Sequence, residues 1–138
     1  MGRLLGVDHG DRRIGLALSD PIPLIASPLK TVTINNYREG VEAIIEIVKK
    51  YEVILVVIGN PIGLKGNDTA QTKHVKKFAE DLQKCNIDIA LIDERLTSVS
   101  AKKSWRGHST KFSRNKGLVD QTAAAILLQQ YIDTYYNG

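Results

Sequence analysis

The chain has 138 residues, a length that suits one domain over residues 1–138 and leaves little room for a second. Hydrophobic residues make up 43% of the chain and charged residues 25%, so a packed core can form. We find no N-terminal stretch of signal-peptide type and no apolar run long enough to cross a bilayer. We therefore expect no membrane partner and a cytoplasmic location. The single cysteine, Cys85, cannot form an internal disulfide.

The formal net charge of +4 is unevenly distributed along the chain. No Asp or Glu occurs between Glu94 and Asp120, and the basic residues in that stretch leave the rest of the chain net negative. A positive field beside two acids favours a polyanionic partner, although a solvated basic loop has the same composition. The basic residues, which we predict to bind substrate, are Arg95, Lys102, Lys103, Arg106, Lys111, Arg114 and Lys116.

The first part of the chain predicts antiparallel strands. The apolar run at 3–7 is typical of a buried strand, and the alternation over 14–18 predicts a second strand. The link through His9-Gly10-Asp11 predicts a tight turn, so these two strands should form a hairpin. A third, less regular strand is expected over 24–33, with Pro28 at an edge or a bulge.

The rest of the chain predicts helices alternating with strands. Apolar residues recur at helical spacing, whereas the uninterrupted run VILVVI is typical of a strand buried on both faces. We expect helices around 41–48 and 75–82, strands at 53–58 and 87–92, a weaker helix from about Thr97, a mobile basic loop over 107–116 and a last helix over 117–136.

The resulting order, βββαβαβα, predicts an α/β fold: one mixed five-stranded sheet with helices on both faces. Ligands of such sheets bind beyond the carboxyl ends of the parallel strands. Asp8 closes the first predicted strand and Glu94 follows the last, so both acids should emerge at that rim. Asp120, expected in the first turn of the last helix, joins them if the helix packs against the rim.

Several converging carboxylates suit phosphodiester hydrolysis, because two divalent ions about 4 Å apart can activate a water and stabilise the leaving oxygen. Each acid alone has a simpler explanation. An Asp at the end of a strand often caps a turn, and Asp120 could serve only to favour its helix N-terminus. Asp93 competes with Glu94, and strand alternation points these two neighbours to opposite sides of the sheet.

Four segments carry motifs in register along essentially the whole chain: Gly6–Asp20 (GVDHGDRRIGLALSD), Gly59-Asn60-Pro61 with Gly66, Asp93–Ser98 (DERLTS) and Val119–Ala124 (VDQTAA). These segments resemble motifs of the YqgF family, the RuvC-like resolvases also described as pre-16S rRNA nucleases. The first and third motifs are specific, and the other two would be weak alone. One departure is Asn60, where the family usually has leucine.

The resemblance implies a ribonuclease-H-like fold, with Asp8, Glu94 and Asp120 in the positions of an acidic triad that holds Mg²⁺ or Mn²⁺. It also implies a metal-dependent endonuclease that acts on structured nucleic acid. The substrate would be either pre-16S rRNA at its 5′ end or branched DNA such as a Holliday junction. A resolvase that cuts two strands symmetrically would be expected to work as a homodimer, whereas a processing nuclease need not.

Residues next to the acids have two readings each. Arg12 and Arg13 could contact phosphate as bidentate donors, or one of them could pair with Asp11 or Asp20. His9 could assist proton transfer beside Asp8, but we expect it to be a turn residue, and it has no metal-ligand spacing with His74.

Two other classes of function have to be weighed. A non-catalytic nucleic-acid-binding module of the same fold would need none of the three acids, and all three are present. A sugar-kinase or actin-like ATPase also has an Asp-x-Gly turn after its first strand, as in Asp8-His9-Gly10. Such enzymes usually need two domains around a cleft, which 138 residues do not supply.

Overall fold

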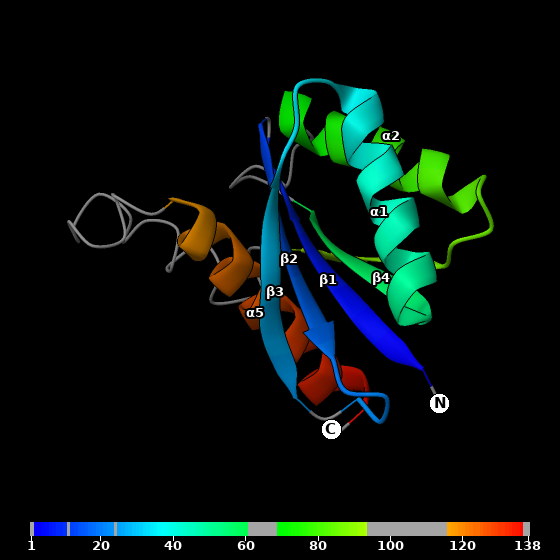
Figure 1. Ribbon diagram of the computed structural model, residues 1–138, viewed down its shortest axis with the longest axis vertical. Helices are drawn as coiled ribbons and strands as arrows, with labels where there is room; N and C mark the ends of the chain where they lie inside the picture. Colours follow the sequence, from blue (N-terminus) through cyan, green and yellow to red (C-terminus); the bar gives the residue numbers. More distant parts are fainter. Residues whose placement is uncertain (1, 11, 24, 61–68, 94–115, 137–138) are drawn as a thin grey trace.

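The computed structural model describes every residue except 1, 11, 24, 61–68, 94–115 and 137–138 (Figure 1). The described elements follow the predicted order βββαβαβα. They are β1 (Arg3–His9), β2 (Arg13–Ser19), β3 (Ala26–Thr33), α1 (Tyr37–Tyr51), β4 (Val53–Asn60), α2 (Ala70–Gln83), β5 (Ile89–Asp93) and α5 (Lys116–Tyr135).

The strands form one mixed sheet in the order β3-β2-β1-β4-β5, as predicted. β1, β2 and β3 pair antiparallel, and β4 pairs parallel with both β1 and β5. The backbone N–H of Gly10 donates to the carbonyl oxygen of Arg13 at 2.9 Å and closes the predicted hairpin. Pro28 lies in the edge strand β3 opposite Ala17, where the register shifts, which confirms the expectation of an edge or a bulge.

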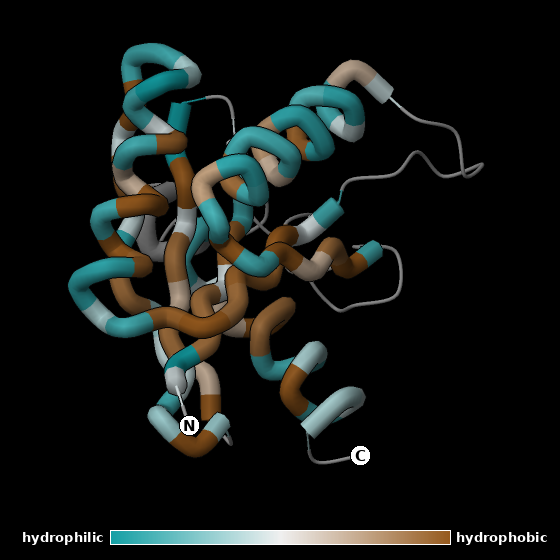
Figure 2. The backbone as a smooth tube through the Cα atoms, turned by 90° about the vertical axis from the view of Figure 1, so that its right-hand side faces the viewer, coloured by the Kyte–Doolittle hydropathy of each residue, from teal (hydrophilic) through white to brown (hydrophobic). Residues whose placement is uncertain are grey.

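Helices α1 and α2 cover one face of the sheet and α5 covers the other (Figure 1). Because successive strand residues point to opposite faces, β1 contributes to two cores. Leu5 and Val7 pack on the side of α1 and α2, whereas Leu4 packs on the side of α5. Most residues along the central strands are hydrophobic, whereas α1 and α2 contain many hydrophilic residues (Figure 2).

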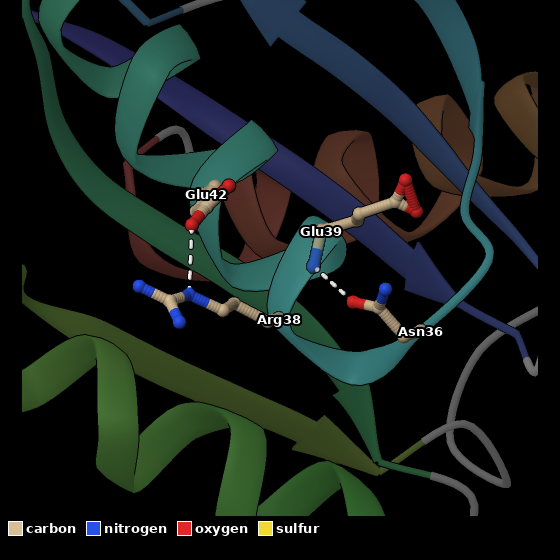
Figure 3. Close-up of polar contacts among 4 residues, drawn as sticks. All are labelled: Asn36, Arg38, Glu39 and Glu42. Carbon is tan, nitrogen blue, oxygen red and sulfur yellow. Dashed lines mark hydrogen bonds and ion pairs between the residues drawn. The ribbon is translucent and has the colours of Figure 1, made fainter.

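Helix α1 shows how local sequence sets the ends of an element. The side chain of Asn36 accepts a hydrogen bond from the backbone N–H of Glu39 at 3.0 Å and caps the helix (Figure 3). Such a cap contributes about 1 kcal/mol. Arg38 pairs with Glu42 at 3.0 Å on the exposed side of the same helix. The helix ends at Glu52, whose backbone is left-handed with φ 54°.

Three predictions about element ends need correction. His9 belongs to β1 and is buried, so the prediction of a turn residue is wrong; its ring packs on Phe78. Helix α5 begins at Lys116, which therefore belongs to the helix and not to the predicted loop. Asp120 consequently lies beyond the first turn, which contains no acidic residue, so the simpler dipole explanation of Asp120 loses its basis.

The weaker helix predicted near Thr97 and the loop positions 107–115 lie outside the described residues. Within the part of the chain that the structure describes, no helix has both the length and the apolar character needed to span a membrane.

Candidate active site

Asp8 is the next-to-last residue of β1 and only 5% exposed. Its direction follows from the residues before it on the strand. Leu4 packs with α5, and a Cβ on Gly6 would lie 2.7 Å from Cβ of Leu128, which is also in α5. Because strand residues two apart share a face, Asp8 points to the α5 side of the sheet.

Gly15 brings the second acid to the same place. It is the strand partner of Asp8 in the β1–β2 hairpin. A Cβ on Gly15 would lie 2.1 Å from the carbonyl oxygen of Asp120, so only glycine lets α5 pass so close to β2. The helix therefore places Asp120, which is 6% exposed, directly over the residue that faces Asp8 across the hairpin.

Arg13 forms an ion pair with Asp120. Its Nε donates a hydrogen bond to Oδ2 of the carboxylate at 2.7 Å, and the two side chains are 35% and 8% exposed. The alternation of β2 explains the contact, because Arg13 and Gly15 share the face that α5 covers. Asp120 was not among the acids considered for this arginine from the sequence, Asp11 and Asp20; of those two, Asp11 lies outside the described residues.

Asp93 lies on the other face of the sheet. Ile92 packs in the core beneath α5 and Ile89 in the opposite core, so alternation assigns Asp93 to the α2 side, away from Asp8. Glu94, the predicted third acid, lies outside the described residues. The structure thus brings together Asp8 and Asp120. Among the described residues, no group of three His, Cys, Asp or Glu side chains is arranged to hold a metal ion.

The predicted substrate-binding residues are described only in part. Arg12 is exposed just before β2, and its carbonyl oxygen accepts a hydrogen bond from the backbone N–H of Ile34 at 2.9 Å. Lys116 is the first residue of α5, and the remaining predicted positions, Arg95, Lys102, Lys103, Arg106, Lys111 and Arg114, lie outside the described residues.

A cluster of rings on the α2 side was missed by the sequence reasoning. The ring of His9 lies 5.0 Å from that of His74 and 4.5 Å from that of Phe78, measured between centroids. Parity with Leu5 and Val7 could have placed His9 on this face, and the spacing of His74 and Phe78 could have placed both on one side of α2. The cluster packs the end of β1 against α2, on the opposite face from Asp8.

Asn60, the departure from the family motif, ends β4 and is 7% exposed. Its side-chain oxygen is buried and finds no hydrogen-bond partner among the residues that the structure describes. A buried amide needs hydrogen-bond partners for its polar atoms, a requirement that leucine would not have.

Comparison with known proteins gives consistent matches. Residues 2–134 match the model of the family described as "RuvX: Holliday junction resolvase". A protein of Crocosphaera subtropica is 44% identical over 131 residues, which cover 94% of this chain and 91% of that protein. A protein of Caldanaerobacter subterraneus is 39% identical over 138 residues, with 99% of both chains covered. Both carry the name "Putative pre-16S rRNA nuclease".

Solved structures match the fold. RuvC of T. thermophilus in complex with a Holliday junction aligns with a TM-score of 0.59 at 15% identity, covering 97% of this chain and 95% of that one. The Fowlpox virus resolvase in complex with Holliday junction DNA aligns with a TM-score of 0.60 at 10% identity, covering 97% and 99%. These matches confirm the predicted ribonuclease-H-like α/β fold.

Proposed function

The chain belongs to the RuvX family of Holliday junction resolvases, the family predicted from its motifs, and from this we propose that it is a metal-dependent nuclease acting on structured nucleic acid. The observation that carries the proposal is the meeting of two buried carboxylates, Asp8 and Asp120, on one face of the sheet around Gly15. Buried carboxylates are retained where they are paired with a cation or coordinate a metal.

The carboxylates fit a hard divalent cation, because Mg²⁺ and Mn²⁺ prefer oxygen ligands. Asp8, Glu94 and Asp120 would hold the metal. When bound, it supplies an activated water and stabilises the leaving oxygen of a phosphodiester. The exposed Arg12 and the basic positions of 95–116 would hold the substrate backbone by contacts to phosphate.

The relatives favour ribosomal RNA as the substrate. The proteins that are 39–44% identical carry the pre-16S rRNA nuclease name, whereas the structures bound to Holliday junctions are only 10–15% identical. We therefore propose processing of the 5′ end of pre-16S rRNA, in the cytoplasm, as the reaction, with junction cleavage as the competing activity. A junction resolvase would be expected to be a homodimer, so light scattering belongs with the assay.

The test is cleavage of a pre-16S rRNA fragment and of a four-way DNA junction, with Mg²⁺ and with Mn²⁺. The wild-type protein should cut in the presence of metal, and Asp8→Asn should lose activity by about a hundredfold or more. Asp20→Asn is the matched control, because it removes the same charge from an exposed position just after β2. It should cut like the wild type.

Each outcome decides between the alternatives. Equal cleavage by Asp8→Asn and the wild type would show that the assigned site is wrong. Binding of both substrates without cleavage under either metal would favour the non-catalytic binding module. Binding of ATP without binding of nucleic acid would revive the kinase-like alternative. Cleavage of the junction alone would replace rRNA by branched DNA as the substrate.

A further inference from the structure

The Arg13–Asp120 ion pair joins a candidate metal ligand to a fixed cation. The two residues are 107 positions apart in sequence, and the pair links β2 to α5 at 2.7 Å. The carboxylate is nearly buried while the arginine side chain is one-third exposed. A carboxylate withdrawn from water in this way needs a compensating positive charge.

The pair has little to do with placing the helix. The backbone of Asp120 already packs against Gly15. A Cβ on Gly15 would lie 2.1 Å from the carbonyl oxygen of Asp120. Further along α5, a Cβ on Gly6 of β1 would lie 2.8 Å from the carbonyl oxygen of Ala124. Close packing of the two backbones therefore fixes the position of Asp120, and what Arg13 adds is charge next to the carboxylate.

We infer that Arg13 is the resident counter-ion of Asp120 in the metal-free protein and competes with the divalent metal for this carboxylate. The inference rests on the proposed function, because it takes Asp120 as a metal ligand. A guanidinium at hydrogen-bond distance neutralises part of the charge that attracts the metal, and it repels a second cation close by. Arg13 thus acts through Asp120, and its charge sets the metal concentration at which the site fills.

The sign of the effect separates this role from a structural one. If Arg13 only held the site together, its removal would weaken metal binding. If it competes with the metal, its removal strengthens binding. Arg12→Gln supplies the matched control, since it removes the same charge from the neighbouring exposed residue.

The experiment is a titration with Mn²⁺ alone, followed by calorimetry and by the paramagnetic resonance signal of free Mn²⁺. We expect Arg13→Gln to bind Mn²⁺ about tenfold more tightly than the wild type, and Arg12→Gln to stay within about twofold because an exposed charge is screened. Arg13→Lys keeps the charge but not the planar donor, so its affinity should fall between those of the wild type and Arg13→Gln. Equal or weaker binding by Arg13→Gln overturns the inference.

A second measurement compares the thermal stability of the variants. Without metal, Arg13→Gln should unfold at a lower temperature than Arg12→Gln, because it removes the ion pair of the nearly buried Asp120 carboxylate. Adding Asp120→Asn to Arg13→Gln should restore part of that loss. If Arg13→Gln does not fold, Arg13→Lys carries the titration, and binding by Arg13→Lys no tighter than the wild type overturns the inference.

The same titration separates failure of the inference from failure of the proposed function. If the wild type does not bind Mn²⁺, or if Asp120→Asn binds it as tightly as the wild type, the proposed metal site is wrong. The inference is then wrong as well. If Asp120→Asn removes binding but Arg13→Gln matches Arg12→Gln, the metal site stands and the inference alone is wrong.

Discussion

At Gly15 the backbone of α5 comes so close to β2 that no side chain fits between them. The obstructing atom is the carbonyl oxygen of Asp120, which belongs to a helix backbone and has no rotamer to escape into. Gly40 of α1 differs, because the atom nearest to an added Cβ belongs to a side chain: the tip of Ile14 at 3.1 Å. One glycine is thus tied to the candidate active site, and the other only to helix packing.

We expect Gly15→Ala to lower the free energy of unfolding by about 3 kcal/mol or more, because a clash with backbone cannot relax without moving the helix. It should also weaken Mn²⁺ binding, since Asp120 moves with α5. Gly40→Ala is the control: the gain in helix propensity, about 1 kcal/mol, should offset the contact with Ile14. Urea unfolding and Mn²⁺ titration check both variants. A Gly15→Ala protein as stable as the wild type would contradict this close packing of α5 on β2.

At the scale of elements, α1 and α2 are joined by a hydrogen bond between polar side chains. The hydroxyl of Tyr37 donates to Oδ2 of Asp81, and Nζ of Lys77 lies 4.9 Å from the centroid of the Tyr37 ring. Burial raises the pKa of Tyr37 above its ordinary value, and the hydrogen bond to Asp81 and its negative charge raise it further. The folded state therefore favours the neutral phenol.

This shift predicts a loss of stability in alkali. The pKa of Tyr37 is raised in the folded state, so the neutral phenol contributes to the free energy of unfolding. This contribution is complete below the pKa of tyrosine in the unfolded chain, about 10, and is lost as the pH rises above that value. Tyr37→Phe should lower the free energy of unfolding by about 1 kcal/mol at neutral pH. Above about pH 10, the stability of this variant should fall less steeply than that of the wild type. Urea unfolding across pH 8 to about 11 measures the difference.

Tyr51→Phe is the control for this prediction, because it changes a tyrosine at the other end of α1 and leaves the Tyr37–Asp81 bond in place. It should keep the steep alkaline loss of the wild type. Parallel curves for Tyr37→Phe and the wild type would show that this tyrosine does not contribute to the pH dependence.

For the whole molecule, the sheet separates two cores with different consequences for the site. Leu127 lies in the core between the sheet and α5, and Ile44 in the core beneath α1 and α2; neither side chain is exposed. Only the first core supports a helix that carries one of the candidate acids.

We expect Leu127→Ala and Ile44→Ala each to lower stability by about 2–5 kcal/mol, because both leave a cavity in a packed core. Leu127→Ala should also weaken Mn²⁺ binding, since α5 then loses part of the packing that places Asp120. Ile44→Ala should bind Mn²⁺ like the wild type. Measured on folded protein, equal Mn²⁺ affinities for the two variants would contradict this division.

Much of the fold could be predicted from local sequence. Alternation and helical spacing determined the order of the elements, and the long motif around Asp8 identified the family before any contact was known. Edge position and irregular pairing at Pro28 followed from the chemistry of proline alone. These features depend on residues close together in the chain, whose patterns reflect one strand or one helix at a time.

The tertiary structure decided what lies across the sheet. The partner of Arg13 is Asp120 and Gly15 admits the helix backbone, because both depend on where a distant helix crosses a strand. No local pattern encodes such a crossing. Glu94 and the basic positions of 95–115 stay predictions from the sequence, whereas the meeting of Asp8 and Asp120 around one glycine follows from how α5 packs.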